Sequence, residues 1–197
     1  MPTQHLRKAL RTELRAARRQ LSTPQQALAA EGVSCQLSLH FSNSCRLKVG
    51  VYLANDGEVD LSHFINSTQK LFSFSLPVLH PICKGHLLFL EYLSDTHLTN
   101  NKYGILEPEL ACHHVVPTHE LDVILMPLVG FDNDGNRLGM GGGYYDRTLA
   151  YTRHSIKKPM LIGVAHDLQR VDRLPYALWD IPLNAIVTPT RFQHFSV

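Results

Sequence analysis

Six short apolar runs separated by helix-like segments constrain the fold of this chain most strongly. The runs cover residues 49–53, 71–79, 86–92, 123–126, 161–165 and 185–187. Most are continuously apolar instead of alternating with polar residues, which is typical of strands buried on both faces of a parallel sheet. The sequence therefore predicts an α/β fold with a largely parallel sheet and helices on both faces. Because such sheets bind ligands at the carboxyl ends of their strands, the loops after Leu53 and Met126 are the first candidates for a site.

Length and composition predict one domain that spans residues 1–197. The chain is 44% hydrophobic, and no Gly/Ser-rich or Pro-rich stretch divides its 197 residues. This length is sufficient for one substantial core. No window approaches the ~20 consecutive apolar residues that cross a bilayer, and no apolar segment follows the basic N-terminus as it would in a secretory signal. We therefore expect a cytoplasmic protein that does not contact membranes.

The cysteines and histidines do not indicate a zinc or redox site. Cys35, Cys45, Cys83 and Cys112 lie far apart, without a C-x-x-C pair. We expect them to be reduced and mostly buried thiols. The 12 histidines are scattered, and none has the H-E-x-x-H spacing of a helical zinc site, so exposed loop positions are expected for them.

The N-terminal segment carries a local excess of positive charge. Apolar residues recur at steps of three and four over residues 4–21, which predicts an amphipathic helix. Residues 1–19 contain six basic residues and one acid, whereas the formal net charge of the whole chain is only +2. Basic residues on such a helix are often simply solvated, but they are also suited to nucleotide phosphates or to nucleic acid.

A glycine-rich segment is the strongest signal for function. Residues 139–143 contain four glycines in five positions and precede a predicted helix over residues 144–153. Without Cβ atoms, backbone N–H groups can approach an anion closely, and the start of a helix adds a positive dipole end. A surface turn is the alternative, but a turn needs only one or two glycines. The segment therefore predicts a phosphate-binding loop.

This loop differs from the two common nucleotide-binding motifs. A P-loop ends in Gly-Lys-Ser/Thr, whereas Tyr-Tyr-Asp stands here, and about twelve residues separate Met126 from Gly139, unlike in a Rossmann turn. Arg137 could neutralise phosphate charge. Asp146 could bind Mg²⁺, which prefers a carboxylate together with phosphate oxygens and waters. The alternative role for Asp146 is compensation of the helix dipole.

Two linked motifs give the chain a specific resemblance. Residues 126–132 read Met-Pro-Leu-Val-Gly-Phe-Asp, and residues 137–147 read Arg-Leu-Gly-Met-Gly-Gly-Gly-Tyr-Tyr-Asp-Arg. Together they resemble the signature of the 5-formyltetrahydrofolate cyclo-ligase family. The basic residues 7–11, the segment 52–58 and the segment 103–108 match that family in the same order. The resemblance therefore spans nearly the whole chain.

The resemblance implies a fold similar to sugar-phosphate isomerases and CoA transferases, and an ATP-dependent ligase that needs Mg²⁺. In the family's reaction the formyl oxygen of 5-formyltetrahydrofolate attacks the γ-phosphorus of ATP. A neighbouring folate amine then attacks the activated carbon, and loss of phosphate gives 5,10-methenyltetrahydrofolate. Such chemistry depends on positioning and charge neutralisation, which suits glycine amides, arginines and a metal.

The resemblance also implies roles for individual residues. Leu53 and Glu58 match folate-binding positions, Asp146 matches the metal ligand, and Arg137 and Tyr145 are expected to be catalytic. The ATP-binding positions are Arg7, Lys8, Arg11, Arg137, Leu138, Gly139, Met140, Gly141, Gly142, Gly143, Tyr144 and Tyr145. The chain departs from the family near its end, where Asp180 follows Trp179 and Asn184 stands in place of a further aspartate. A second metal ligand in that region is left open.

Two other functions compete with this interpretation. A nucleic-acid-binding module would account for the basic helix but not for the glycine-rich loop or Glu58. Sugar-phosphate isomerisation or CoA transfer would keep the fold and change the reaction, because fold does not fix function. The basic helix and the loop followed by Tyr-Tyr-Asp favour the cyclo-ligase. We therefore expect ATP and 5-formyltetrahydrofolate as small-molecule partners, without nucleic acid, membrane or an obligate protein partner.

Overall fold

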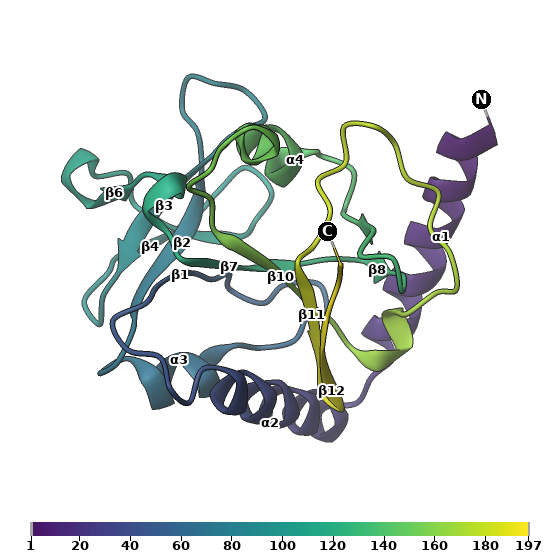
Figure 1. Ribbon diagram of the computed structural model, residues 1–197, viewed down its shortest axis with the longest axis horizontal. Helices are drawn as coiled ribbons and strands as arrows, with labels where there is room; N and C mark the ends of the chain where they lie inside the picture. Colours follow the sequence, from purple (N-terminus) through teal and green to yellow (C-terminus); the bar gives the residue numbers. More distant parts are fainter. Residues whose placement is uncertain (1, 197) are drawn as a thin grey trace.

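An eight-stranded mixed sheet forms the centre of the computed structural model, which describes residues 2–196 (Figure 1). Its strands, in spatial order, are β12 (Arg191–His194), β11 (Ala185–Thr188), β10 (Met160–Val164), β7 (Val123–Pro127), β1 (Lys48–Gly50), β2 (Ser73–Leu79), β3 (Leu87–Tyr92) and β6 (Val115–Val116). The five strands from β11 to β2 are parallel. At the two edges the pairing is antiparallel: β12 pairs with β11, β3 with β2, and β6 with β3. This confirms the predicted α/β class. The predicted domain limits include residues 1 and 197, which lie outside the described part.

The apolar runs are continuous because the central strands are covered on both faces. In β7, Leu125 faces the core that contains Val33, Leu37 and Phe64. Its neighbours Ile124 and Met126 face the opposite core. All three β7 residues are fully buried. Side chains alternate between the faces of a strand, so a strand with two buried faces needs an apolar residue at every position.

Two helices cover one face of the sheet, and a short helix covers part of the other (Figure 1). Helix α2 (Thr23–His40) and α3 (Ser62–Thr68) pack together below the sheet in this view. Ser22 caps α2 through a capping box with Gln25. The helix predicted over residues 144–153 is instead α4 (Tyr144–Thr148) followed by a 3₁₀ turn, η3 (Ala150–Arg153). Further 3₁₀ turns are η1 (Cys112–His114), η2 (Thr118–Glu120) and η4 (Asp167–Gln169).

Helix α1 (Pro2–Arg19) lies beside the sheet and packs on a small hairpin, β8 (Gly130–Phe131) and β9 (Arg137–Leu138). Leu14 is buried there against Gly130, where a Cβ would lie 2.6 Å from its Cδ1. The hairpin occupies the stretch between β7 and the glycine-rich loop. It therefore explains why that loop begins about twelve residues after Met126, and it brings the loop to α1.

The buried carboxylate of Asp132 organises this hairpin. Its Oδ1 accepts hydrogen bonds from the backbone N–H groups of Asp134 and Asn136, both at 3.0 Å. Its Oδ2 accepts from Asn136 Nδ2 and from Leu174 N, both at 2.9 Å. The aspartate of the first motif thus has a structural role here.

A second hairpin, β4 (Leu98–Asn100) with β5 (Leu106–Pro108), lies outside the main sheet. The prediction of mostly buried cysteines is wrong, because Cys35, Cys45, Cys83 and Cys112 are all exposed. Cys35 lies between the buried residues Val33 and Leu37 of α2, where helical periodicity turns it to solvent. Among residues 2–196, no helix is long and apolar enough to span a membrane.

Candidate functional site

A cleft of about 1790 Å³ opens at the carboxyl ends of β1, β2 and β7. Its walls are one side of α1 from Thr3 to Arg19, the loop after β1, the glycine-rich loop with α4, the β4–β5 hairpin, and residues 176–180. Both loops that the sequence singled out, after Leu53 and after Met126, therefore reach one cleft. This is the position at which parallel sheets bind ligands.

Helix α1 presents four arginines to the cleft, Arg7, Arg11, Arg15 and Arg19, and the first two are not simple solvated side chains. Arg11 Nε donates a hydrogen bond to the carbonyl oxygen of Gly139 at 2.7 Å. Arg7 Nη2 lies 3.1 Å from Asp180 Oδ1, and its Nη1 donates to the carbonyl oxygen of Pro175. Partial burial, together with the nearby charge of Arg7, lowers the pKa of Arg11. Lys8 is placed differently: it is exposed and lies in a shallow depression outside the main cleft.

The glycine-rich loop has the backbone conformation that only glycine adopts easily. The φ angles are +103° at Gly141 and +65° at Gly143. Gly142 does not have a positive φ, but a Cβ there would lie 2.7 Å from the Tyr144 ring. Leu138 points away from the cleft, with its side chain in the core and only 1% of the residue exposed. Its predicted role in ATP binding is therefore confined to its backbone.

Arg147 ties the loop to its surroundings, although the sequence did not single it out as a site residue. Its Nε donates to the carbonyl oxygen of Gly85 at 2.9 Å, and its Nη2 donates to the carbonyl oxygen of Gly142. The same guanidinium lies over the Tyr144 ring, 5.8 Å from the centroid. Tyr144 in turn shares a 2.7 Å hydrogen bond between hydroxyls with Tyr103. These contacts hold the start of α4 at the mouth of the cleft.

Arg137 and Asp146 form an ion pair deep in the cleft. Arg137 Nη2 lies 2.6 Å from Asp146 Oδ1, which also accepts from the backbone N–H of Ile181 at 3.1 Å. The Arg137 side chain is only 4% exposed, and within residues 2–196 its Nε has no hydrogen-bond partner. A buried guanidinium with an unsatisfied donor is suited to an oxyanion such as a phosphate oxygen.

The carboxylates of the cleft suit a magnesium ion that also has phosphate ligands. Asp146 and Asp180 lie on adjoining segments, because Ile181 bonds to Asp146. The described residues contain no group of three His, Cys, Asp or Glu side chains placed to bind a metal. Mg²⁺ commonly takes only one or two carboxylates and completes its shell with phosphate oxygens and waters. Asn184 is occupied elsewhere, since its Oδ1 accepts from Leu161 N in β10 at 2.8 Å.

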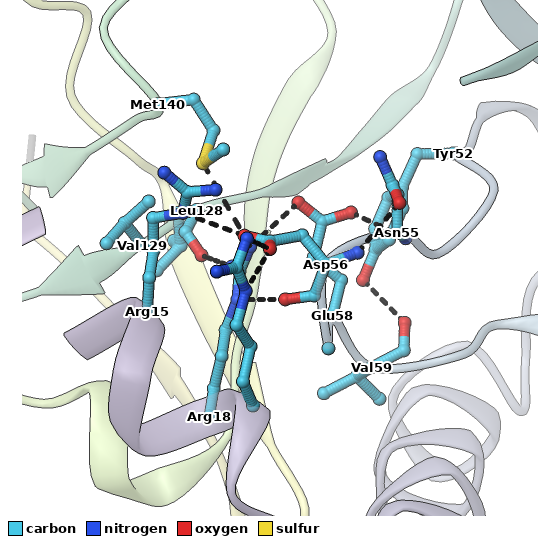
Figure 2. A network of polar contacts seen from close by, with 12 residues as sticks. Arg15, Arg18, Tyr52, Asn55, Asp56, Glu58, Val59, Leu128, Val129 and Met140 are labelled. Atoms are coloured by element: carbon cyan, nitrogen blue, oxygen red, sulfur yellow. Dashed lines mark hydrogen bonds and ion pairs between the residues drawn. The ribbon is translucent and has the colours of Figure 1, made fainter. Parts of the chain in front are cut away.

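The loop after β1 places the carboxylate of Glu58, whose side chain is 13% exposed, opposite the glycine-rich loop (Figure 2). Glu58 Oε2 accepts from the backbone N–H of Asn55 at 3.1 Å. Burial raises the pKa of Glu58 to about 7, although the positive charge of Arg18 acts in the opposite direction. Burial and the nearby Glu58 also raise the pKa of Tyr145 well above its ordinary value, so that this phenol remains a neutral hydrogen-bond donor. Leu53 lines the cleft beside them.

The fold and the cleft define an α/β protein whose ligand site combines phosphate-binding groups with a partly buried carboxylate. The chain matches the 5-formyltetrahydrofolate cyclo-ligase family over residues 3–189. It is 42% identical to the 5-formyltetrahydrofolate cyclo-ligase of Haemophilus influenzae over 183 residues, which cover 92% of this chain and 96% of that protein. It is 41% identical to the Escherichia coli K12 enzyme of the same name, over 90% of this chain and 97% of the relative.

A solved structure agrees with these relatives. The NMR structure of Aquifex aeolicus 5,10-methenyltetrahydrofolate synthetase has a TM-score of 0.79 and 31% sequence identity, and the match covers 96% of this chain and 92% of that one. The chain therefore belongs to the 5-formyltetrahydrofolate cyclo-ligase family, which confirms the prediction made from the two linked motifs.

Proposed function

We propose that this chain catalyses the ATP-dependent cyclisation of 5-formyltetrahydrofolate to 5,10-methenyltetrahydrofolate, with release of ADP and phosphate. The observation that carries the proposal is that the linked motifs of the family and the partly buried Glu58 line one cleft. Family membership confirms the prediction of a cyclo-ligase enzyme of folate one-carbon metabolism. It also distinguishes this enzyme from isomerases and transferases of similar fold.

ATP binds between α1 and the glycine-rich loop in this proposal. Arg7, Arg11 and Arg137 supply positive charge from two sides of the cleft, and the glycines allow backbone N–H groups to reach phosphate oxygens. Asp146 is the residue that would hold Mg²⁺, and a bound ion would supply further neutralisation of the phosphate charge. The exposed position of Lys8 gives it at most a peripheral role.

The folate binds at the opposite wall, with Glu58 and Leu53. A carboxylate accepts hydrogen bonds from the N–H donors along the amino-pyrimidine edge of the pterin. Leu53 provides an apolar surface next to it. The proposal requires the formyl group to point towards the phosphate-binding side, which lines the same cleft.

Catalysis then requires little covalent chemistry from the protein. The formyl oxygen attacks the γ-phosphorus and ADP leaves; the neighbouring folate amine attacks the activated carbon, loses its proton, and phosphate departs with the former formyl oxygen. Arg137 stabilises the charge that develops on the transferred phosphoryl group. The neutral Tyr145 hydroxyl lies near both Glu58 and Arg137 and can donate a hydrogen bond to an oxygen of the reacting groups.

The structure favours small molecules over nucleic acid as partners. Arg7, Arg15 and Arg18 are engaged with Asp180 and Asp56, so the basic stripe of α1 is turned inward and largely paired. A stripe of this kind leaves little free positive charge for a polyanion. We place the enzyme in the cytoplasm, where ATP and reduced folates are its expected partners.

A direct assay tests the proposed function. Purified protein is mixed with 5-formyltetrahydrofolate and MgATP, and methenyl formation is followed by absorbance. We expect product that depends on ATP, on Mg²⁺ and on enzyme concentration. A folded protein that gives no product above the enzyme-free control would refute the proposal.

A further inference from the structure

Arg18 is a fully buried cation at the junction of three parts of the cleft wall (Figure 2). Its Nε donates to the carbonyl oxygen of Asp56 at 2.7 Å, and its Nη2 donates to Asp56 Oδ2 at 2.7 Å. Its Nη1 donates to the carbonyl oxygen of Leu128, just after β7, at 3.0 Å. The guanidinium fork therefore holds α1, the loop after β1 and the end of β7 in one fixed arrangement.

The same guanidinium reaches the two sides of the proposed site. Nη2 lies 3.6 Å from Glu58 Oε1 and 4.0 Å from the Met140 sulfur in the glycine-rich loop. The contact with Glu58 is charged, whereas the contact with Met140 is weak. We therefore expect Arg18 to act mainly on the folate side.

Asp56 anchors the loop that carries Glu58. Burial alone would raise the pKa of Asp56, but hydrogen bonds from Arg15, Arg18 and Arg19 outweigh it and lower the pKa to about 2. Asp56 also has a φ of +54°, which is uncommon for a residue other than glycine. Such backbone strain persists only where the surroundings enforce it. Arg18 contributes most to that enforcement at neutral pH, where Asp56 is an anion, because it is fully buried and bonds both the carbonyl oxygen and the carboxylate of Asp56.

We propose that Arg18 is a positioning residue for Glu58, which fixes the loop 55–59 against α1 and sets a positive charge opposite the carboxylate that receives the folate. The proposal rests on the proposed function for the assignment of Glu58 to the folate. It assigns Arg18 no contact with either substrate. Arg18 acts through Glu58, because its side chain is closed off from the cleft.

The charges around Glu58 predict a pH-dependent effect. Several titratable and charged groups face this loop. Helix α1 contributes Arg15, Arg18 and Arg19, of which Arg19 pairs with Asp56. The others are Asp56 from the same loop, Tyr52 and Asp60 at its two ends, Tyr145 from α4, and His166 before η4, whose Nε2 is 3.0 Å from the carbonyl oxygen of Gly57. Among the groups that influence Glu58 itself, Arg18 is the strongest that favours its ionised form. Loss of that charge raises the pKa of Glu58 above about 7, so less carboxylate is present at neutral pH.

The decisive experiment measures the affinity for 5-formyltetrahydrofolate by calorimetry between pH 6 and 9, with Arg18→Gln as the variant. We expect an affinity roughly tenfold or more lower at pH 7, and a midpoint of the pH dependence that moves upward by on the order of one unit. The affinity for ATP should change by less than about threefold, since the Met140 contact is weak. A merely structural role would not move the pH midpoint.

Arg19→Gln is the matched control. Arg19 binds the same Asp56 carboxylate, but its side chain is 55% exposed and its charge is not among those that influence Glu58. Exposed ion pairs contribute little, so we expect folate affinity within about twofold of wild type and an unchanged pH midpoint. A shift as large as that of Arg18→Gln would contradict the specific role of Arg18.

Arg18→Lys separates charge from geometry and also covers the case in which Arg18→Gln does not fold. Lysine keeps a positive charge but lacks the planar fork. We expect a wild-type pH midpoint with clearly weaker folate binding. The proposal would be overturned if Arg18→Lys bound the folate with wild-type affinity. It would also be overturned if folded Arg18→Gln kept both the wild-type folate affinity and the wild-type pH midpoint.

Glu58→Gln shows whether a negative result refutes the role of Arg18 or the assignment of Glu58 to the folate site. If Glu58→Gln binds the folate as wild type does, the folate site itself is wrongly assigned. If Glu58→Gln weakens folate binding while Arg18→Gln does not, only the role of Arg18 is refuted.

Discussion

The carboxylate of Asp146 lies 2.6 Å from the guanidinium of Arg137, at the base of the cleft where the glycine-rich loop leads into α4. The two residues are nine positions apart, and the β8–β9 hairpin and the loop bring them together. Arg137 is nearly buried, so it depends on this partner for charge compensation. The pair therefore combines a structural contact with the proposed binding of Mg²⁺ and phosphate.

Asp146→Asn tests the metal assignment. If Asp146 holds Mg²⁺, turnover should fall on the order of a hundredfold, because the amide lacks the anionic oxygen that this hard cation prefers. If the carboxylate only compensates the buried charge of Arg137, the loss should be about 3–5 kcal/mol of stability, with the Mg²⁺ dependence of turnover unchanged. Turnover across a Mg²⁺ titration, with thermal unfolding of both proteins, separates the two. Wild-type turnover and Mg²⁺ dependence would refute the metal role.

Gly142→Ala tests whether the loop binds ATP. The added methyl group would lie 2.7 Å from Tyr144 Cδ2, so either the ring or the loop must move. We expect ATP affinity to fall by roughly tenfold, while folate affinity at the opposite wall stays near wild type. Calorimetry with each ligand provides its own control. Equal weakening for both ligands would indicate general distortion, and no change for ATP would show that the loop is only a turn.

The raised pKa of Glu58 predicts that the protein becomes less stable as the pH rises through about 7. Its pKa in the folded protein is raised from 4.5 to about 7, so the folded state binds the proton more tightly than the unfolded chain. The associated stability is fully present below about pH 4.5 and is lost as pH rises through about 7. Glu58→Gln removes this loss and should gain stability relative to wild type by at most about 3 kcal/mol at pH 8. Urea unfolding at pH 5 and pH 8 measures the difference, and a constant difference would contradict the prediction.

Asp132→Asn tests the structural role of the aspartate in the first motif. The carboxylate accepts four hydrogen bonds from N–H groups, and an amide would turn its own donor towards some of them. We expect a loss of about 2–3 kcal/mol in the free energy of unfolding. Turnover per folded molecule should remain near wild type below the melting temperature. A stable variant with strongly reduced turnover would instead place Asp132 in the catalytic site.

Much of the fold follows from local sequence patterns. The strand β7 was predicted within one residue of its observed end, because its apolar run and its limits are local features. The glycine-rich loop was also predicted, since a cluster of glycines and the positive φ angles that it allows are local features. The linked motifs identified the family because they too are short continuous runs of sequence, residues 126–132 and 137–147. The prediction that the helix continues beyond Thr148 was wrong. The apolar pattern continues there, but the chain forms a 3₁₀ turn over Ala150–Arg153.

The partners of the charged side chains were decided only by the tertiary structure. Arg18 meets Asp56 and Leu128 across 38 and 110 positions, and Arg7 meets Asp180 across 173. The sequence showed the basic residues of the first helix and the segment 52–58, but no local spacing relates them. The sequence by itself determined the central strands, the chemistry of the glycine-rich loop and the family, whereas the β4–β5 and β8–β9 hairpins appeared only in the structure. Packing of Leu14 on the β8–β9 hairpin decided which arginines face the cleft, because a helix's contacts depend on the surface against which its apolar side is buried.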